Sequence, residues 1–381
     1  MKEFNIKKRK IFQRFALIFS AVMLASLSSC IKIEMRDSSA EQQAEAEESA
    51  TLMLTQATKK YTVESAPEAD TQKAQAEDER EVITFSVCGN IVMDENIISD
   101  AANRATEGKS YSFLKMYTGV YNDISSADTA ICTYSALNNE NGEAVQSPIE
   151  SVGAIYDLGI DVVNTDKSTG ISGYLGEYEL DEILPSSDAV IIENNGLNIA
   201  CLSLTESSSD YASEIEYAGF VSDIVMVFVD WNDGTTDTEM KNTAVKIAEA
   251  GADIIIGNGK SLGGVEWLDT GDGTLTLAAY SLGNILADSD NVSGLCGGIL
   301  NFSICYGNGS IGIEDVVLTP TLIHYISDED SDHTGYQVFT FESYRNELAE
   351  QHAVNDFSVE GLKAYIGKKV KSDFLPSYFR Q

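Results

Sequence analysis

Residues 251–284 constrain the fold more strongly than any other part of the sequence. Gly251 ends a stretch with helical spacing over 244–250. Ile254–Ile256 is a short run of β-branched apolar residues, which is typical of a strand buried on both faces. A glycine-rich loop follows, and a second apolar strand is expected over 275–280. Because open α/β sheets place their functional groups at the carboxyl ends of strands, this loop is the first candidate site.

The rest of the chain continues the alternation of strands and helices. Strands are predicted at 82–90, 188–193, 197–204, 223–229, 297–305, 311–318 and 336–341, and helices at 150–158, 238–250 and 342–354. Asn195-Gly196 between two apolar runs predicts a hairpin with a type I′ turn. The length of 381 residues suits one large α/β domain, predicted over 81–350, followed by a C-terminal tail over 351–381.

The first thirty residues are typical of a bacterial lipoprotein leader. A basic Lys7-Lys8-Arg9-Lys10 segment precedes an apolar run, Phe15–Leu27, which is too short to span a membrane. Leu27-Ser28-Ser29-Cys30 then resembles a lipobox. The pattern predicts a signal peptide over 1–29 and a lipid on Cys30, which places the protein on the extracytoplasmic face of the bacterial plasma membrane. An ordinary signal peptide with an incidental cysteine is the alternative.

Residues 30–80 are rich in Ala, Glu, Gln, Ser and Thr, and we expect an acidic, flexible tether there, with Met53-Leu54 as an apolar island. The formal net charge of the chain is −35. Nucleic acid is therefore excluded as a partner, because its phosphates would be repelled. Anionic polymers are disfavoured as well, unless divalent cations bridge them to the protein.

Apart from Cys30, the chain has five cysteines, an odd number that cannot all pair. Four lie in apolar, strand-like runs, and no two have metal-site spacing, so we expect buried hydrophobic roles; the five are Cys88, Cys132, Cys201, Cys296 and Cys305. The three histidines are His324, His333 and His352. All lie after the 251–284 stretch, and none is predicted to be a site residue.

Four short motifs follow one another along the chain, each next to a predicted strand. Gly89-Asn90 ends the first strand, Asp230-Trp231 ends another, Gly251-Ala252-Asp253 precedes a third, and Tyr280-Ser281-Leu282-Gly283-Asn284 follows a fourth. Together they resemble the CapA family, named for capsule or poly-γ-glutamate synthesis, of the metallophosphatase superfamily. The resemblance covers 81–350 and implies a metallophosphatase-like α/β sandwich with mixed central sheets flanked by helices.

The resemblance also implies where a metal site would lie, and this chain departs from the family pattern there. Positions where the family has metal-binding or catalytic groups are Asn90, Ser135, Thr169, Ser172, Asp230, Gly259 and Ser261, with Lys260 between two of them. Frame positions that match are Gly89, Trp231, Gly257, Ser281, Gly283 and Asn284. One carboxylate and one amide cannot organise two cations. We therefore expect no metal, no cofactor and no catalytic residue. Lys260 could replace a metal charge, bind an anion, or simply be a solvated loop lysine.

The resulting functional expectation is a membrane-anchored surface lipoprotein of the CapA-like family. It would be a pseudoenzyme that binds or scaffolds during synthesis, anchoring or export of a capsular polymer. Its expected partners are the membrane, through the lipid on Cys30, and an anionic capsular polymer or capsule-synthesis proteins. Two alternatives stay open. One is an active metal-dependent hydrolase or transferase rebuilt around Asp230, Lys260 and Asn90. The other is a solute-binding lipoprotein, which would need two lobes and a hinge.

Overall fold

The computed structural model describes residues 80–137, 145–165, 169–185, 188–206, 208, 211–232, 234–271, 273–327, 333–355 and 357–379. All of them belong to one compact unit, Lys60–Gln381. The predicted signal peptide, Cys30 and nearly all of the predicted tether lie outside the described residues. Within the described residues, no helix is both long enough and apolar enough to span a membrane.

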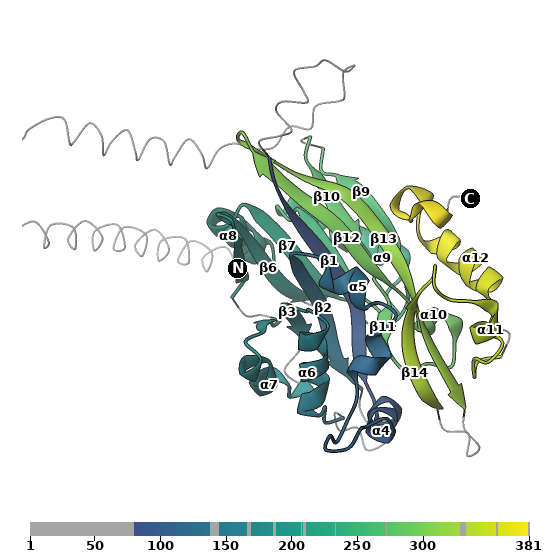
Figure 1. The fold of residues 1–381 in the computed structure, drawn as a ribbon. Helices are drawn as coiled ribbons and strands as arrows, with labels where there is room; N and C mark the ends of the chain where they lie inside the picture. The colour runs from purple at the N-terminus through teal and green to yellow at the C-terminus, as the bar shows by residue number, and fades with distance from the viewer. Residues whose placement is uncertain are drawn as a thin grey trace, which may run out of the picture. The chain divides into compact units, whose positions relative to one another are not determined.

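The first of two sheets has eight strands in the order β14-β13-β12-β1-β2-β3-β4, with β11 also paired to β1 (Figure 1). Its strands are β1 (Glu81–Met93), β2 (Thr129–Ala136), β3 (Val162–Thr165), β4 (Asp181–Ile183), β11 (Asn284–Leu286), β12 (Cys296–Gly307), β13 (Ser310–Ser327) and β14 (His333–Thr340). The strands β1 to β4 are parallel, whereas β12, β13 and β14 pair antiparallel. The sheet is therefore mixed.

The second sheet has six strands in the order β5-β6-β7-β8-β10-β9. Its strands are β5 (Val190–Asn194), β6 (Leu197–Thr205), β7 (Ile224–Asp230), β8 (Ile254–Asn258), β9 (Val265–Asp269) and β10 (Leu275–Ala279). The central strands β6, β7, β8 and β10 are parallel, and the edge strands β5 and β9 pair antiparallel. This sheet is mixed too.

The apolar runs fold as strands because both faces of the second sheet are covered. In β7, Met226 and Phe228 point into the core that includes first-sheet residues, while Val225, Val227 and Val229 point to the other face. Alternate side chains of a strand point to opposite faces, so a continuous apolar run is needed here. The expected mixed α/β sandwich with helices on its faces is confirmed.

Two helices cover the outer face of the second sheet. They are α8 (Tyr211–Val221) and α9 (Asp237–Glu249), which contribute Ile215, Ala244 and Ile247 to its outer core. Helix α9 begins with a capping box. The Thr236 side chain accepts from the Glu239 backbone, and the Glu239 carboxylate accepts from the Thr236 backbone.

The first sheet carries the remaining helices, which contribute Ile97, Val152, Ile155 and others to the shared core. They are α4 (Glu95–Asn103), α5 (Tyr121–Ser125), α6 (Ile149–Asp157), α7 (Ser172–Glu177), α10 (Val292–Leu295), α11 (Asn346–Ala349) and α12 (Val359–Lys369), with 3-10 turns at Leu114–Tyr117, Ser372–Phe374 and Ser377–Phe379. In the region predicted as a C-terminal tail, Leu362 and Ile366 of α12 pack into this core.

Most predicted elements form, and the exceptions have physical reasons. The hairpin turn is confirmed, with positive φ angles of 49° at Asn195 and 81° at Gly196. The helix predicted over 342–354 is wrong except at Asn346–Ala349. Its first residues turn instead, because Tyr344 is buried and its hydroxyl bonds His324 Nδ1 at 2.9 Å. Strand β1 continues past Asn90, through a register shift, to Met93.

Candidate functional site

Four polar residues form a row across the first sheet, near the carboxyl ends of β1, β2 and β3 and at the start of β11. Asn90 of β1 is in register with Asn284 of β11 and with Thr133 of β2, and Thr133 is in register with Asn164 of β3. All four side chains are buried. Asn164 Nδ2 donates to Thr133 Oγ1 at 3.3 Å. We call these four residues the amide row.

The amide row is tied to the loops that follow β8 and β10 of the second sheet. Asn90 Nδ2 donates to the carbonyl oxygen of Gly259 at 3.2 Å, and the Ser281 hydroxyl donates to the same oxygen at 3.2 Å. Asn284 Nδ2 donates to the carbonyl oxygens of Lys260 at 3.2 Å and of Gly294 at 2.8 Å. The sequence-predicted positions Asn90, Gly259, Lys260, Ser281 and Asn284 are therefore brought together.

Glycines allow close backbone contacts with the 280–283 segment at this point. A Cβ on Gly89 would lie 2.5 Å from the carbonyl oxygen of Gly283. A Cβ on Gly257 would overlap the carbonyl oxygen of Tyr280 and the indole nitrogen of Trp231. Gly283 itself has a φ of 61°, a left-handed conformation that favours glycine. The frame glycines are therefore explained by close packing of backbone on backbone.

The ends of β7 and β8 form the other side of the site. Asp230 is in register with Asn258, whose Nδ2 donates to Asp230 Oδ1 at 3.2 Å. Trp231 is buried, and its indole N–H donates to the Tyr280 carbonyl at 2.7 Å. The side chains of Asp230 and Lys260 are exposed. Trp231 therefore supports the frame, whereas Asp230 and Lys260 face solvent.

The remaining predicted positions lie on neighbouring segments. Ser135 is half-buried near the end of β2, in register with Val92. The Thr169 hydroxyl is buried 3.1 Å from that of Thr165. Ser172 begins α7 and donates to Glu182 Oε1 at 2.7 Å. Ser261 is half-buried, directly after Lys260.

Three buried amide oxygens at this site have no hydrogen-bond partner among the described residues. They are the Oδ1 atoms of Asn164, Asn258 and Asn284. A buried acceptor without a donor costs about 1–3 kcal/mol, so such atoms call for N–H or O–H groups. The site is therefore equipped to accept hydrogen bonds from a bound molecule or from water.

A two-metal centre, which the family resemblance implies, does not fit these residues. Hard cations need several anionic oxygen or imidazole ligands. Asp230 is the one carboxylate among the predicted positions, and its Oδ1 accepts from Asn258. Within the part of the chain that has described structure, no group of three His, Cys, Asp or Glu residues is arranged to hold a metal ion.

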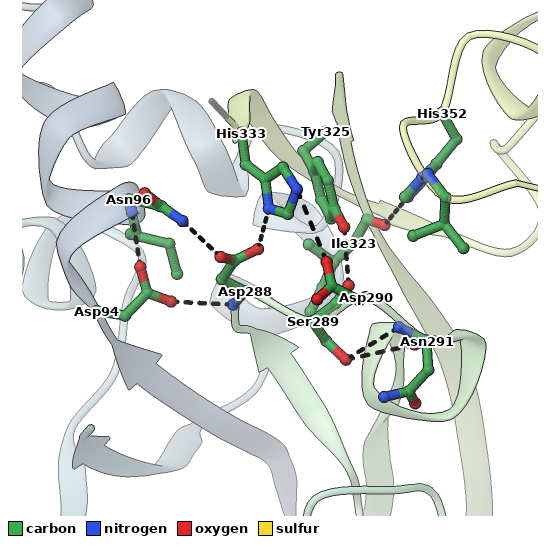
Figure 2. A network of polar contacts seen from close by, with 12 residues as sticks. Asp94, Asn96, Asp288, Ser289, Asp290, Asn291, Ile323, Tyr325, His333 and His352 are labelled. Atoms are coloured by element: carbon green, nitrogen blue, oxygen red, sulfur yellow. Dashed lines mark hydrogen bonds and ion pairs between the residues drawn. The ribbon is translucent and has the colours of Figure 1, made fainter. Parts of the chain in front are cut away.

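A second polar cluster, which the sequence analysis missed, lies beyond the amide row (Figure 2). Asp94 follows β1 and Asp288 follows β11, each four residues after a member of the amide row. His333 Nδ1 lies 2.7 Å from Asp288 Oδ1, and its Nε2 lies 3.7 Å from Asp290 Oδ1. Asn96 donates to Asp288 Oδ2 at 2.7 Å. The cluster joins the ends of β1 and β11 to the start of β14.

The carboxyl group of Asp94 in this cluster has a raised pKa. Burial raises its pKa to about 6; its hydrogen bond from Ile97 lowers the pKa, and the nearby Asp288 charge raises it. Asp94 also caps α4, because Oδ1 accepts from Ile97 N at 2.9 Å. Hydrolysis by a His–Asp pair would need a nucleophile beside the imidazole, but His333 Nε2 faces Asp290. The cluster therefore fixes three segments relative to one another.

A local sequence pattern indicates a structural role for Asp94, but none connects His333 with Asp288. Asp94 before Glu95 at the end of a strand is a helix-start pattern. His333 comes 45 residues after Asp288, so no local spacing connects them.

Comparisons with known proteins give distant structural likenesses only. No protein-family model and no curated protein matches the chain. A hypothetical protein from Thermus thermophilus is similar at 13% identity and a TM-score of 0.40, over 62% of this chain and 99% of that one. Chaetomium thermophilum Vps29 is similar at 8% identity and a TM-score of 0.28, over 67% and 95%. These values assign neither a family nor a function.

Proposed function

We propose that this protein is a membrane-anchored surface lipoprotein of the CapA-like family whose strand-end site binds a ligand without hydrolysing it. Its role is then binding or scaffolding during synthesis, anchoring or export of poly-γ-glutamate or another capsular polymer. The observation that carries the proposal is the chemistry of the strand-end site. It offers buried amide oxygens and hydroxyls where hydrolysis by two metals would need carboxylates and imidazoles.

The unpartnered amide oxygens also favour a kind of ligand. Asn164, Asn258 and Asn284 each hold a buried acceptor, which a ligand reaches only when the strand-end loops open. A polyamide supplies N–H donors at regular intervals, so its backbone complements these oxygens. The net charge of −35 opposes an anionic polyamide over long range. Binding of poly-γ-glutamate is therefore expected to require a divalent cation such as Ca²⁺ between protein and polymer carboxylates.

Anchoring is tested on the full chain expressed in its own bacterium. Mass spectrometry of the wild type should show a diacylglyceryl Cys30, and Cys30→Ala should leave uncleaved precursor. In a strain lacking the gene, wild type should restore cell-bound polymer and Cys30→Ala should not. An unlipidated wild-type protein would refute the lipoprotein assignment.

The binding site is tested in vitro with the full chain and purified poly-γ-glutamate. We expect Ca²⁺-dependent binding that Asn164→Ala weakens. Asn122→Ala, on the exposed face of α5, is the matched control and should bind as wild type does. Equal binding by both variants, or no binding with Ca²⁺ present, would contradict a polymer site at the strand ends.

A further inference from the structure

Two adjoining hollows lie at the other end of the second sheet from the candidate site. One has a volume of about 370 Å³ and the other about 540 Å³, and both are lined by Trp267, Ile313 and Glu314. The smaller hollow also reaches Ile224, the first residue of β7. The candidate functional site instead includes Asp230, the last residue of β7. Six steps along a strand span about 20 Å. We call the two hollows together the Trp267 groove.

The smaller of the two hollows has a mainly apolar lining that is open to solvent. Trp267 is 36% exposed and Leu275 is 40% exposed. Ile311 and Ile313 of β13 are half-buried beside them. Cavities of a few hundred Å³ with apolar walls and a few placed polar groups are typical of small-molecule sites. The groove therefore has the size and the lining of a binding site.

The charged groups of the groove are mainly acidic. Its lining includes Asp253, Glu314, Asp315 and Asp373, together with the cation Lys371. Lys371 Nζ lies 3.3 Å from Glu266 Oε2. Arg80 Nη1 lies 2.6 Å from Glu314 Oε1, so Glu314 is already neutralised. The groove keeps a negative balance, within a chain whose net charge is −35.

Asp315 is an exposed carboxylate in the lining of the groove. It is exposed and, among the described residues, makes no hydrogen bond or ion pair. Its φ is 54°. It lies at a bulge in β13, because the register between β12 and β13 shifts between the pairs Asn301–Val317 and Ser303–Glu314. Bulges redirect side chains and leave the extra residue out of the ladder. Asp315 thus comes to the groove from the first sheet, while Trp267 comes from the second.

We propose that the Trp267 groove binds an organic cation, an ammonium group carried on an apolar body. The face of a tryptophan ring attracts a cation, and more strongly when water is partly excluded. The Asp315 carboxylate supplies the opposite charge, and Leu275 and Ile313 contact the apolar body. An anionic ligand would be repelled by the net negative charge of the groove. A neutral ligand would gain only the apolar contacts.

The test uses butyltrimethylammonium as the probe and 3,3-dimethylbutanol as an uncharged ligand of similar shape. The full chain has two tryptophans, so indole N–H signals in an NMR spectrum separate Trp267 from buried Trp231. The cation should shift the Trp267 signal in a saturable manner, and the alcohol should bind at least about tenfold more weakly. Trp267→Phe assigns the signal.

Asp315→Asn removes the charge and keeps the backbone, because asparagine tolerates left-handed φ angles. It should weaken binding of the cation by about tenfold and leave binding of the alcohol unchanged. Glu179→Gln is the matched control, an exposed acidic residue with a φ of 56° outside the groove. Equal affinity for cation and alcohol, no saturable shift at Trp267, or equal effects of both substitutions would overturn the proposal. The signal lies at Trp267, so this result is independent of polymer binding at the strand ends.

Discussion

The backbone N–H of Asn90 donates a 2.8 Å hydrogen bond to the carbonyl oxygen of Gly283. These residues belong to motifs almost two hundred positions apart, at the end of β1 and just before β11. The contact shows that these two motifs hold the fold together through their backbones. The frame residues hold backbone against backbone, and that packing does not depend on a bound metal.

Gly257 should tolerate no side chain. An added Cβ would overlap the Tyr280 carbonyl oxygen and the Trp231 indole nitrogen, and backbone on one side cannot move away. Gly257→Ala should lower the free energy of unfolding by about 3 kcal/mol, measured by urea denaturation. Gly367→Ala is the control, because a Cβ there meets no atom within 4 Å and α12 gains helix propensity. Equal stability of the two variants would contradict the packing described.

His352 should make folding sensitive to acid. The side chain is buried, its Nε2 lies 3.1 Å from the Ile323 carbonyl oxygen, and its Nδ1 accepts from Val354 N. Burial lowers its pKa to about 4 from 6.5. The unfolded chain therefore binds the proton first, and stability falls as pH drops from 6.5 towards 4. The full effect is about 3 kcal/mol.

The difference between wild type and His352→Gln isolates this effect, since Asp94 and Asp253 have raised pKa values that act in the opposite direction. Urea denaturation between pH 4 and pH 7 should show a smaller acid-induced loss of stability in the variant. Parallel stability curves would show that His352 titrates alike in both states.

The five described cysteines should be unreactive in the folded protein. All are buried and unpaired, as the sequence predicted. Burial raises the pKa of Cys88, Cys201 and Cys296 to about 12, so little thiolate exists at pH 8. In the Cys30→Ala chain, Ellman's reagent should react only after denaturant is added. Lys109→Cys, at an exposed position, supplies a fast-reacting reference. A fast thiol in the parent chain would show local opening.

Local patterns predicted most of the fold. Runs such as Ile254–Ile256 and the turn Asn195-Gly196 are determined by nearby residues, so their structures could be predicted. The helix predicted over 342–354 failed because tertiary contacts of Tyr344 outweigh local periodicity. The amide row could be seen only from the register between strands. Motifs nevertheless identified its members Asn90 and Asn284, and also Gly259, whose carbonyl oxygen Asn90 contacts.

Other features needed three-dimensional contacts that no motif encodes. His333 meets Asp288 across strands, and its place in the sequence gave no sign of this pairing. The Trp267 groove combines β9, β13 and the segment after α12, which are separate in sequence. Trp267 lies on the edge strand β9, where the sequence analysis predicted no strand.

The central claim is that the strand-end site binds without metal-dependent hydrolysis, and the metal content of the full chain tests it most directly. After exposure to Mn²⁺ or Zn²⁺ and gel filtration, wild type and Asp230→Ala should retain equally little metal, and neither should hydrolyse bis-p-nitrophenyl phosphate above buffer. Asp230 is the informative position, because it is the one carboxylate among the predicted site positions. Stoichiometric metal and a measurable hydrolytic rate in wild type, both lost in Asp230→Ala, would contradict the account.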